Sequence, residues 1–161
     1  MKKFLVYAVI GLGVVAYNVA TQADRDMSGA IVSGGNVDAF QMRIGDCFND
    51  TGALGMDEAG EVSSLPGVPC ADPHDNEVYA VFDVDLESFP GDESMGEMAF
   101  AQCLEHFQGF VGIVYEESVL DITALYPSDQ SWSAQDDREV VCAVYDMNDN
   151  KLTGSVKDSA I

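Results

Sequence analysis

The chain of 161 residues is long enough for one domain with its own core, and its 47% hydrophobic content excludes a disordered tail. It carries 28 acidic residues against 7 lysines and arginines, a formal net charge of -21. A field of this sign repels phosphate backbones and anionic lipids, so we expect no nucleic acid as a partner. The acids are scattered through predicted loops, which favours a role in solubility over attraction of cations or a basic partner.

Residues 1–23, MKKFLVYAVIGLGVVAYNVATQA, predict a signal peptide or a membrane anchor. Two lysines precede an apolar run whose length suits a signal-peptide core and reaches the lower limit of a membrane span at Ala20. The lysines place the following residues outside the cytoplasm, either anchored through residues 4–20 or secreted after cleavage. The polar, glycine-containing residues 24–36 predict a flexible tether, and residues 37–161 predict the exported domain.

Three strands are predicted in the first half of this domain. Residues 40–48 form the first, with a bulge at Gly45. Residues 61–70 form an interrupted strand that two prolines confine to an edge or to a short segment. Residues 77–85 give the clearest strand pattern, with alternate residues on one face: Val78, Ala80, Phe82 and Val84.

A long helix is predicted next. Ser94 and Glu97 have the spacing of a capping box, so we expect a helix from about Met95 to Phe107 that stops at Gly109. Its apolar residues at helical spacing surround Cys103: Phe100, Leu104, Phe107, Phe110 and Val111.

The second half of the domain returns to strand patterns. Residues 118–127 and 138–146 predict strands, and residues 151–156 a short final strand that closes a hairpin through the turn at 147–150. This order predicts an α+β fold with a mostly antiparallel sheet and one long helix packed on it, preceded by an apolar export or anchor helix.

Four cysteines follow the export segment, and an even count in an exported chain indicates two disulfides. No C-x-x-C spacing occurs, which argues against a zinc knuckle or a redox pair. Four cysteines allow three pairings. Periodicity favours Cys103 with Cys142, because both face inward on a predicted helix and strand; Cys47 and Cys70 would then join the first two strands.

His74, in the stretch CADPHDNEV, is the main candidate for chemistry. With Asp72 or Asp75 it could serve as the general base of a small hydrolase. Aspartate and proline also set turns, and a buried histidine bonded to the main chain is the more common arrangement, which we favour. We expect His106 on the polar side of the helix. No nucleophile elbow, zinc motif or phosphate loop occurs, so we predict no catalytic residue, metal or cofactor.

Trp132 and Arg138 form the second candidate binding pair. The alternative is structural, with the tryptophan packed under a loop and the arginine paired with a neighbouring carboxylate. Residues 146–150, DMNDN, resemble the start of a calcium loop but lack its glycine and distal glutamate, which favours a turn.

Several short motifs occur in an order that resembles the septum-formation domain family of actinobacterial exported and membrane-anchored proteins. They are IGDCF (44–48), VPCADPHDNEVYAVFDV (68–84), FPG (89–91), FVG (110–112), LYPSDQSW (125–132), DREVVCAV (137–144) and TGSV (153–156). The similarity covers residues 40–157 and matches the family pattern at Cys47, Cys70, His74, Cys103, Trp132, Arg138 and Cys142. The extreme acidity, and QDDR where members tend to have a glycine before the arginine, depart from that pattern.

The resemblance implies an extracytoplasmic domain associated by name with division septum formation, without an established active site. We therefore expect a non-enzymatic envelope module that binds an envelope or division protein, or a cell-wall component, near the membrane. The alternative is the small exported hydrolase that uses His74 with Asp72 or Asp75.

Overall fold

The computed structural model describes residues 22–50 and 62–161. The predicted signal peptide or anchor therefore lies outside the described residues, apart from its last two positions. Within the described ranges, no helix combines the length and the apolar character needed to cross a bilayer.

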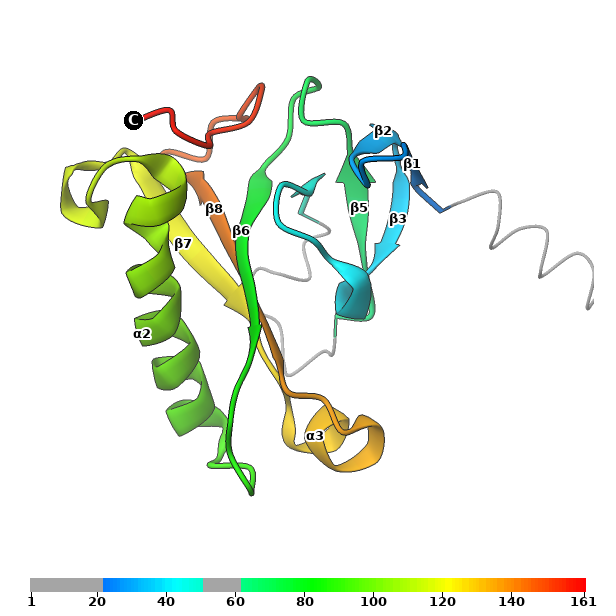
Figure 1. Cartoon of the computed structure of the whole chain (residues 1–161), viewed down its shortest axis with the longest axis vertical. Helices are drawn as coiled ribbons and strands as arrows, with labels where there is room; N and C mark the ends of the chain where they lie inside the picture. Colours follow the sequence, from blue (N-terminus) through cyan, green and yellow to red (C-terminus); the bar gives the residue numbers. More distant parts are fainter. Residues whose placement is uncertain (1–21, 51–61) are drawn as a thin grey trace, which may run out of the picture.

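A six-stranded sheet in the order β3–β5–β4–β6–β8–β7 forms the centre of the domain, with every neighbouring pair antiparallel (Figure 1). Its strands are β3 (Gly35–Asp38), β4 (Cys47–Phe48), β5 (Ser64–Val68), β6 (Asn76–Asp83), β7 (Leu120–Leu125) and β8 (Glu139–Asp146). The remaining elements are β1 (Asp24–Arg25), β2 (Ile31–Ser33), α2 (Asp92–Val111), α3 (Asp129–Gln135) and the 3-10 turns η1 (Ala39–Gln41) and η2 (Tyr115–Glu117). The predicted α+β class is confirmed.

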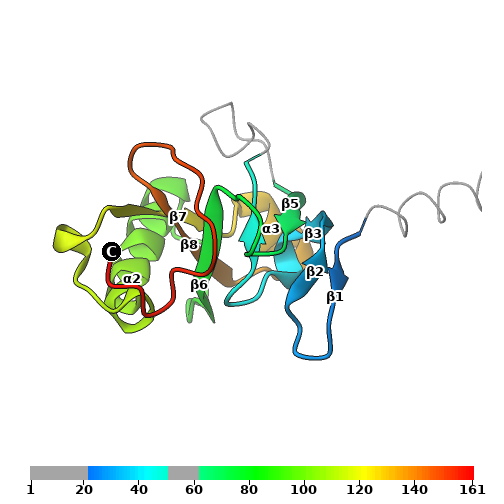
Figure 2. The ribbon, with the colours of Figure 1, turned by 90° about the horizontal axis from the view of Figure 1, so that it is seen from above.

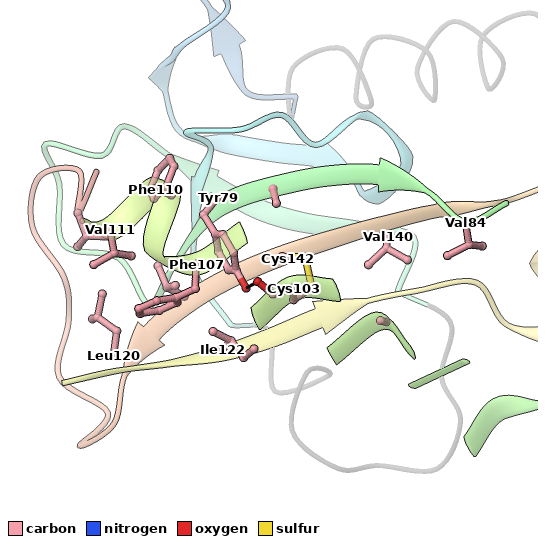
Figure 3. Close-up of a cluster of buried hydrophobic side chains, with 14 of the residues drawn as sticks. Tyr79, Val84, Cys103, Phe107, Phe110, Val111, Leu120, Ile122, Val140 and Cys142 are labelled. Atoms are coloured by element: carbon pink, nitrogen blue, oxygen red, sulfur yellow. Dashed lines mark hydrogen bonds between the residues drawn. A yellow bond between two sulfur atoms is a disulfide. The ribbon is translucent and has the colours of Figure 1, made fainter. Parts of the chain in front are cut away.

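The sheet separates two hydrophobic cores. Helix α2 packs against β6 and β7 over the larger core, and the β1–β2 hairpin lies at the opposite end of the molecule (Figure 2). In the larger core the Tyr79 ring meets Phe107 edge-on at 6.0 Å, and the Tyr79 hydroxyl donates a 2.8 Å hydrogen bond to the Cys103 carbonyl (Figure 3). The smaller core, on the other side, includes Phe48 and Leu65.

The segment 24–36, predicted as a flexible tether, is instead paired into β1, β2 and the start of β3. Ile31 is buried in the smaller core, and the Arg25 guanidinium binds both carboxylate oxygens of Asp46 at 2.5 and 2.7 Å. The strand pattern is absent from the local sequence because β3 is only four residues long and its partner, β5, is distant along the chain.

The first predicted strand, 40–48, is wrong except at Cys47 and Phe48. The residues before β4 form η1 and a turn in which the Asp46 N–H donates to the Arg43 carbonyl, and Gly45 adopts a left-handed φ of +89° within that turn rather than in a bulge. Strand β5 is short, as predicted, but it is not an edge, because β3 pairs along its outer side.

Strand β6 confirms the clearest strand prediction but not its single face. A bulge between Val78 and Ala80 shifts the register against β8. Val78 therefore packs in the smaller core, whereas Ala80 and Val84 pack in the larger one beneath α2. An inserted residue reverses the alternation of a strand, and nothing in the local sequence marks it.

Helix α2 is longer than predicted at both ends. It begins after Gly91, without a side-chain cap, so the capping box at Ser94 is wrong. It passes through Gly109 and ends at Val111. The capping residue Gly112 has a φ of +91°, the left-handed conformation that is common at the C-terminus of a helix. Phe100, predicted on the apolar face, is 43% exposed, whereas the expected buried positions of Cys103 and Phe107 are confirmed.

Strands β7 and β8 confirm their predictions, whereas the segment between them holds the unpredicted helix α3, which Ser128 caps by accepting from the Ser131 N–H. The predicted terminal hairpin is wrong. Leu152 pairs as an isolated bridge with His74, through N–H to carbonyl bonds of 2.8 and 3.0 Å. The C-terminal segment thus lies against the turn before β6.

Candidate functional site

His74 is fully buried, and its contacts are to the main chain. Its Nδ1 lies 2.8 Å from the carbonyl oxygen of Asp72, and its backbone exchanges both hydrogen bonds with Leu152. A ring nitrogen that faces a carbonyl oxygen must carry a proton, so Nδ1 is the donor. The buried Nε2 has no hydrogen-bond partner among the described residues. The imidazole therefore closes the turn at 70–76, and the backbone of His74 joins that turn to the C-terminal segment.

The carboxylates beside His74 are directed elsewhere. Asp75 pairs with Lys151 at 2.6 Å and accepts from the Asp50 N–H at 2.9 Å. Partial burial acts to raise the pKa of Asp75, but these two hydrogen bonds, together with the nearby charges of Lys151 and His74, outweigh it, so that pKa lies below its ordinary value. Asp72 contacts His74 through its backbone carbonyl, and its side chain is exposed. Neither carboxylate has a hydrogen bond to the imidazole in the described structure.

The cysteines form the pairs that periodicity favoured, Cys47 with Cys70 and Cys103 with Cys142. Among the described residues, one cluster of three metal-binding side chains brings both sulfurs of the first bridge near Glu77. Sulfurs joined in a disulfide are not thiolates, so this cluster is a poor metal site. The Glu77 carboxylate instead accepts from the Ser155 hydroxyl at 2.6 Å and the Val156 N–H at 2.7 Å.

Trp132 and Arg138 meet, as a stacked pair at the end of α3. The guanidinium carbon lies 3.5 Å from the centroid of the indole ring, and Arg138 also pairs with Asp136 at 2.9 Å. Trp132 is buried in the larger core against Phe89. The arrangement matches the structural alternative, since the cation covers the ring and is held by a neighbouring carboxylate.

The turn at 146–150 is closed by its own side chains. Oδ1 of Asp146 accepts from the backbone N–H groups of Asn148 at 2.8 Å and Asn150 at 3.4 Å, and from the Asn150 side chain at 2.9 Å. These bonds, led by that from the Asn148 N–H, lower the pKa of Asp146. An oxygen already engaged by three donors of its own turn is a poor start for a cation site.

An open hollow of about 440 Å³ lies between β6 and α2, away from His74. We call it the β6–α2 hollow. Its lining residues come from the turn before β4, from β6, from the last turns of α2 and from the C-terminal segment: Ile44, Tyr79, Ala80, Val81, Glu105, His106, Gly109, Phe110 and Lys157. The size is in the range of ligand sites, and the lining mixes apolar side chains with a few charged ones.

Sequence reasoning assigned none of these lining residues to a site. His106 was expected on the helix surface, and it is exposed there, with its ring 5.5 Å from that of Phe82. The signal that could have indicated the hollow is Gly109, a helical glycine whose α-carbon faces open space. Glycine inside a helix is unfavourable unless a packing or binding role keeps it small.

A protein-family model described as "Septum formation" matches residues 44–160, a range that contains both disulfides, His74, Trp132 and Arg138. No curated protein and no solved structure matches the chain.

Proposed function

The chain belongs to the septum-formation family, and we propose that its domain is a non-enzymatic module of the cell envelope. In this proposal the domain lies outside the cytoplasm, anchored by residues 4–20 or released after cleavage, and binds a protein or a cell-wall component near the membrane. It needs no metal or cofactor.

Two disulfides carry the location part of the proposal. Both bridges are closed, and no described cysteine is free. Disulfides persist in oxidising compartments and are rare in the reducing cytosol. The apolar run that follows Lys2 and Lys3 supports the same location, because it has the composition of an export segment.

The position of His74 carries the non-enzymatic part. A general base needs a path to substrate and an orienting acid within hydrogen-bond reach. His74 is fully buried, its Nδ1 faces a backbone carbonyl, and Asp75 is held by Lys151. These contacts favour a binding module over the alternative of a hydrolase that uses His74 with Asp72 or Asp75.

Incubation of the purified full chain with cell-wall peptidoglycan, followed by mass analysis of soluble fragments, tests the proposal. We expect no release of fragments by the wild type. Release that is lost in His74→Ala but kept in His106→Ala would establish the hydrolase instead. A tagged chain found in the cytoplasm with reduced cysteines would contradict the envelope location.

A further inference from the structure

Within residues 22–50 and 62–161, β6 extends past its pairing with β4, and this part of its edge has no strand partner. Strand β4 pairs with β6 at residues 76 and 77, and the turn before it bonds to Val78. The Val84 N–H donates to the Arg138 carbonyl, so the backbone of Val84 faces β8. In an antiparallel pair every second residue bonds to the partner strand. The N–H and C=O groups of Val81 and Asp83 therefore point away from β8. In residues 22–50 and 62–161, no strand pairs with them there.

The β6–α2 hollow runs beside this edge. Val81 belongs both to the unpaired edge and to the lining, where Ile44 adds a side chain that is 58% exposed. On the α2 side, a β-carbon added at Gly109 would meet no atom within 4 Å outside its own helical turn. An unpaired edge beside a hollow that offers apolar side chains is the arrangement in which extended peptides add as a strand, with backbone bonds for affinity and side-chain pockets for selectivity.

The charge at the end of the edge is unbalanced. Asp83 and Glu139 are cross-strand partners, so two carboxylates lie on one face of neighbouring strands. Burial, and then the charges of Asp83 and Asp137, raise the pKa of Glu139. Among the described residues, no lysine or arginine forms an ion pair with Asp83 or Glu139. A cation supplied from outside would relieve this repulsion.

We propose that the edge of β6 at Val81 and Asp83 binds an extended, basic polypeptide segment as an added strand. The segment carries an apolar side chain against Ile44 and Val81 and, two residues along, a lysine or arginine that faces Asp83. This spacing follows because alternate residues of a strand share a face. A second copy of this acidic chain or an anionic surface is repelled by the net charge of -21. The proposal rests on the proposed binding function and names its partner class.

Binding of a labelled heptapeptide, STVTKTS, to the oxidised full chain in neutral detergent tests the proposal. Amide NMR shifts would identify the contact, and we expect them at Val81 and Asp83. We expect at least tenfold weaker binding when glutamate replaces the lysine of the peptide or when alternate peptide nitrogens are methylated. No saturable binding, equal binding of the lysine and glutamate peptides, or shifts confined to other residues would overturn it.

Two pairs of variants separate the edge from general electrostatics. Asp83→Lys is expected to reverse the preference, so that the glutamate peptide binds more tightly, whereas Asp85→Lys, at an exposed position beyond β6, leaves it unchanged. Gly109→Trp fills the β6–α2 hollow and should weaken binding at least tenfold, whereas Ala101→Trp, at an exposed α2 position outside the lining, should not. Equal effects within either pair would overturn the proposal.

The proposed function fails by a different result. If the full chain releases peptidoglycan fragments, the non-enzymatic function is wrong, whatever the β6 edge binds. If the peptide does not bind, the strand proposal is wrong. The proposed function then still stands, provided that the chain releases no peptidoglycan fragments and is located in the envelope.

Discussion

Removal of the Cys103–Cys142 bridge is predicted to destabilise the domain more than removal of the Cys47–Cys70 bridge. The chain-entropy model assigns about 4 kcal/mol to the Cys103–Cys142 bridge, whose cysteines are 39 residues apart. It assigns about 3.4 kcal/mol to the Cys47–Cys70 bridge, with a separation of 23 residues. Cys103 and Cys142 are both fully buried between α2 and β8, so loss of their sulfur atoms adds on the order of 1 kcal/mol for the cavity.

Urea unfolding of two double alanine variants, each with its other bridge intact, measures this difference. We expect Cys103→Ala with Cys142→Ala to lose about 5 kcal/mol of unfolding free energy, and Cys47→Ala with Cys70→Ala to lose about 3.5 kcal/mol. Peptide mapping without reductant would show that the remaining bridge is formed. A larger loss in the Cys47–Cys70 variant would refute the reasoning, because it would make the bridge with the shorter loop, in which Cys70 is partly exposed, the stronger constraint.

Three further predictions address a helix, a charge pair and the C-terminal segment. Gly109→Ala should raise the free energy of unfolding by about 0.5–1 kcal/mol, because the residue is helical and faces open space. Gly112→Ala should lower the free energy of unfolding by about 1–2 kcal/mol, because Gly112 has a left-handed φ. Thermal unfolding of both variants checks that the two changes have opposite signs. Glu139→Gln should raise the melting temperature at pH 7 by removing a partly buried charge and its repulsion from Asp83 and Asp137. Because folding raises the pKa of Glu139, the wild type regains this stability as the pH falls, and the two melting temperatures should converge below the ordinary pKa of 4.5. Glu77→Gln should lower the free energy of urea unfolding by about 2–3 kcal/mol, because a buried carboxylate that accepts from two donors becomes an amide. Amide hydrogen exchange should rise first in residues 152–156, and exchange that rises first elsewhere would contradict this.

The sequence predicted those elements whose pattern is local and strong. The alternating residues of β6 and β8 and the buried positions Cys103 and Phe107 of α2 follow directly from strand and helix periods. The same periods favoured the observed pairing of Cys103 with Cys142, because only an inward-facing position on each element could reach the other.

The predictions that failed depend on distant partners or on backbone geometry. Ser94 and Glu97 have the spacing of a capping box, yet the helix begins at Asp92, where Glu93 and Asp92 themselves complement the helix dipole. The C-terminal segment was predicted to pair with its neighbour in sequence, but its donors meet Glu77 and the backbone of His74, about eighty residues earlier. No local pattern contains this information.

The candidate site depends on the same distant contacts, which explains why motif reasoning directed attention to His74 instead. Among the described residues, the edge of β6 at Val81 lacks a strand partner because β4 begins only at Cys47, opposite Glu77, and the turn before it leaves Ile44 exposed. A disulfide lies close in sequence to each side of the site: Cys47 follows Ile44 by three residues, and Cys103, which is bridged to β8, precedes the lining residue Glu105 by two. Elements restrained by nearby bridges lose less conformational entropy when a strand is added, so a preorganised edge can bind a short segment that a loose one would not. On this argument the bridges support binding as well as stability.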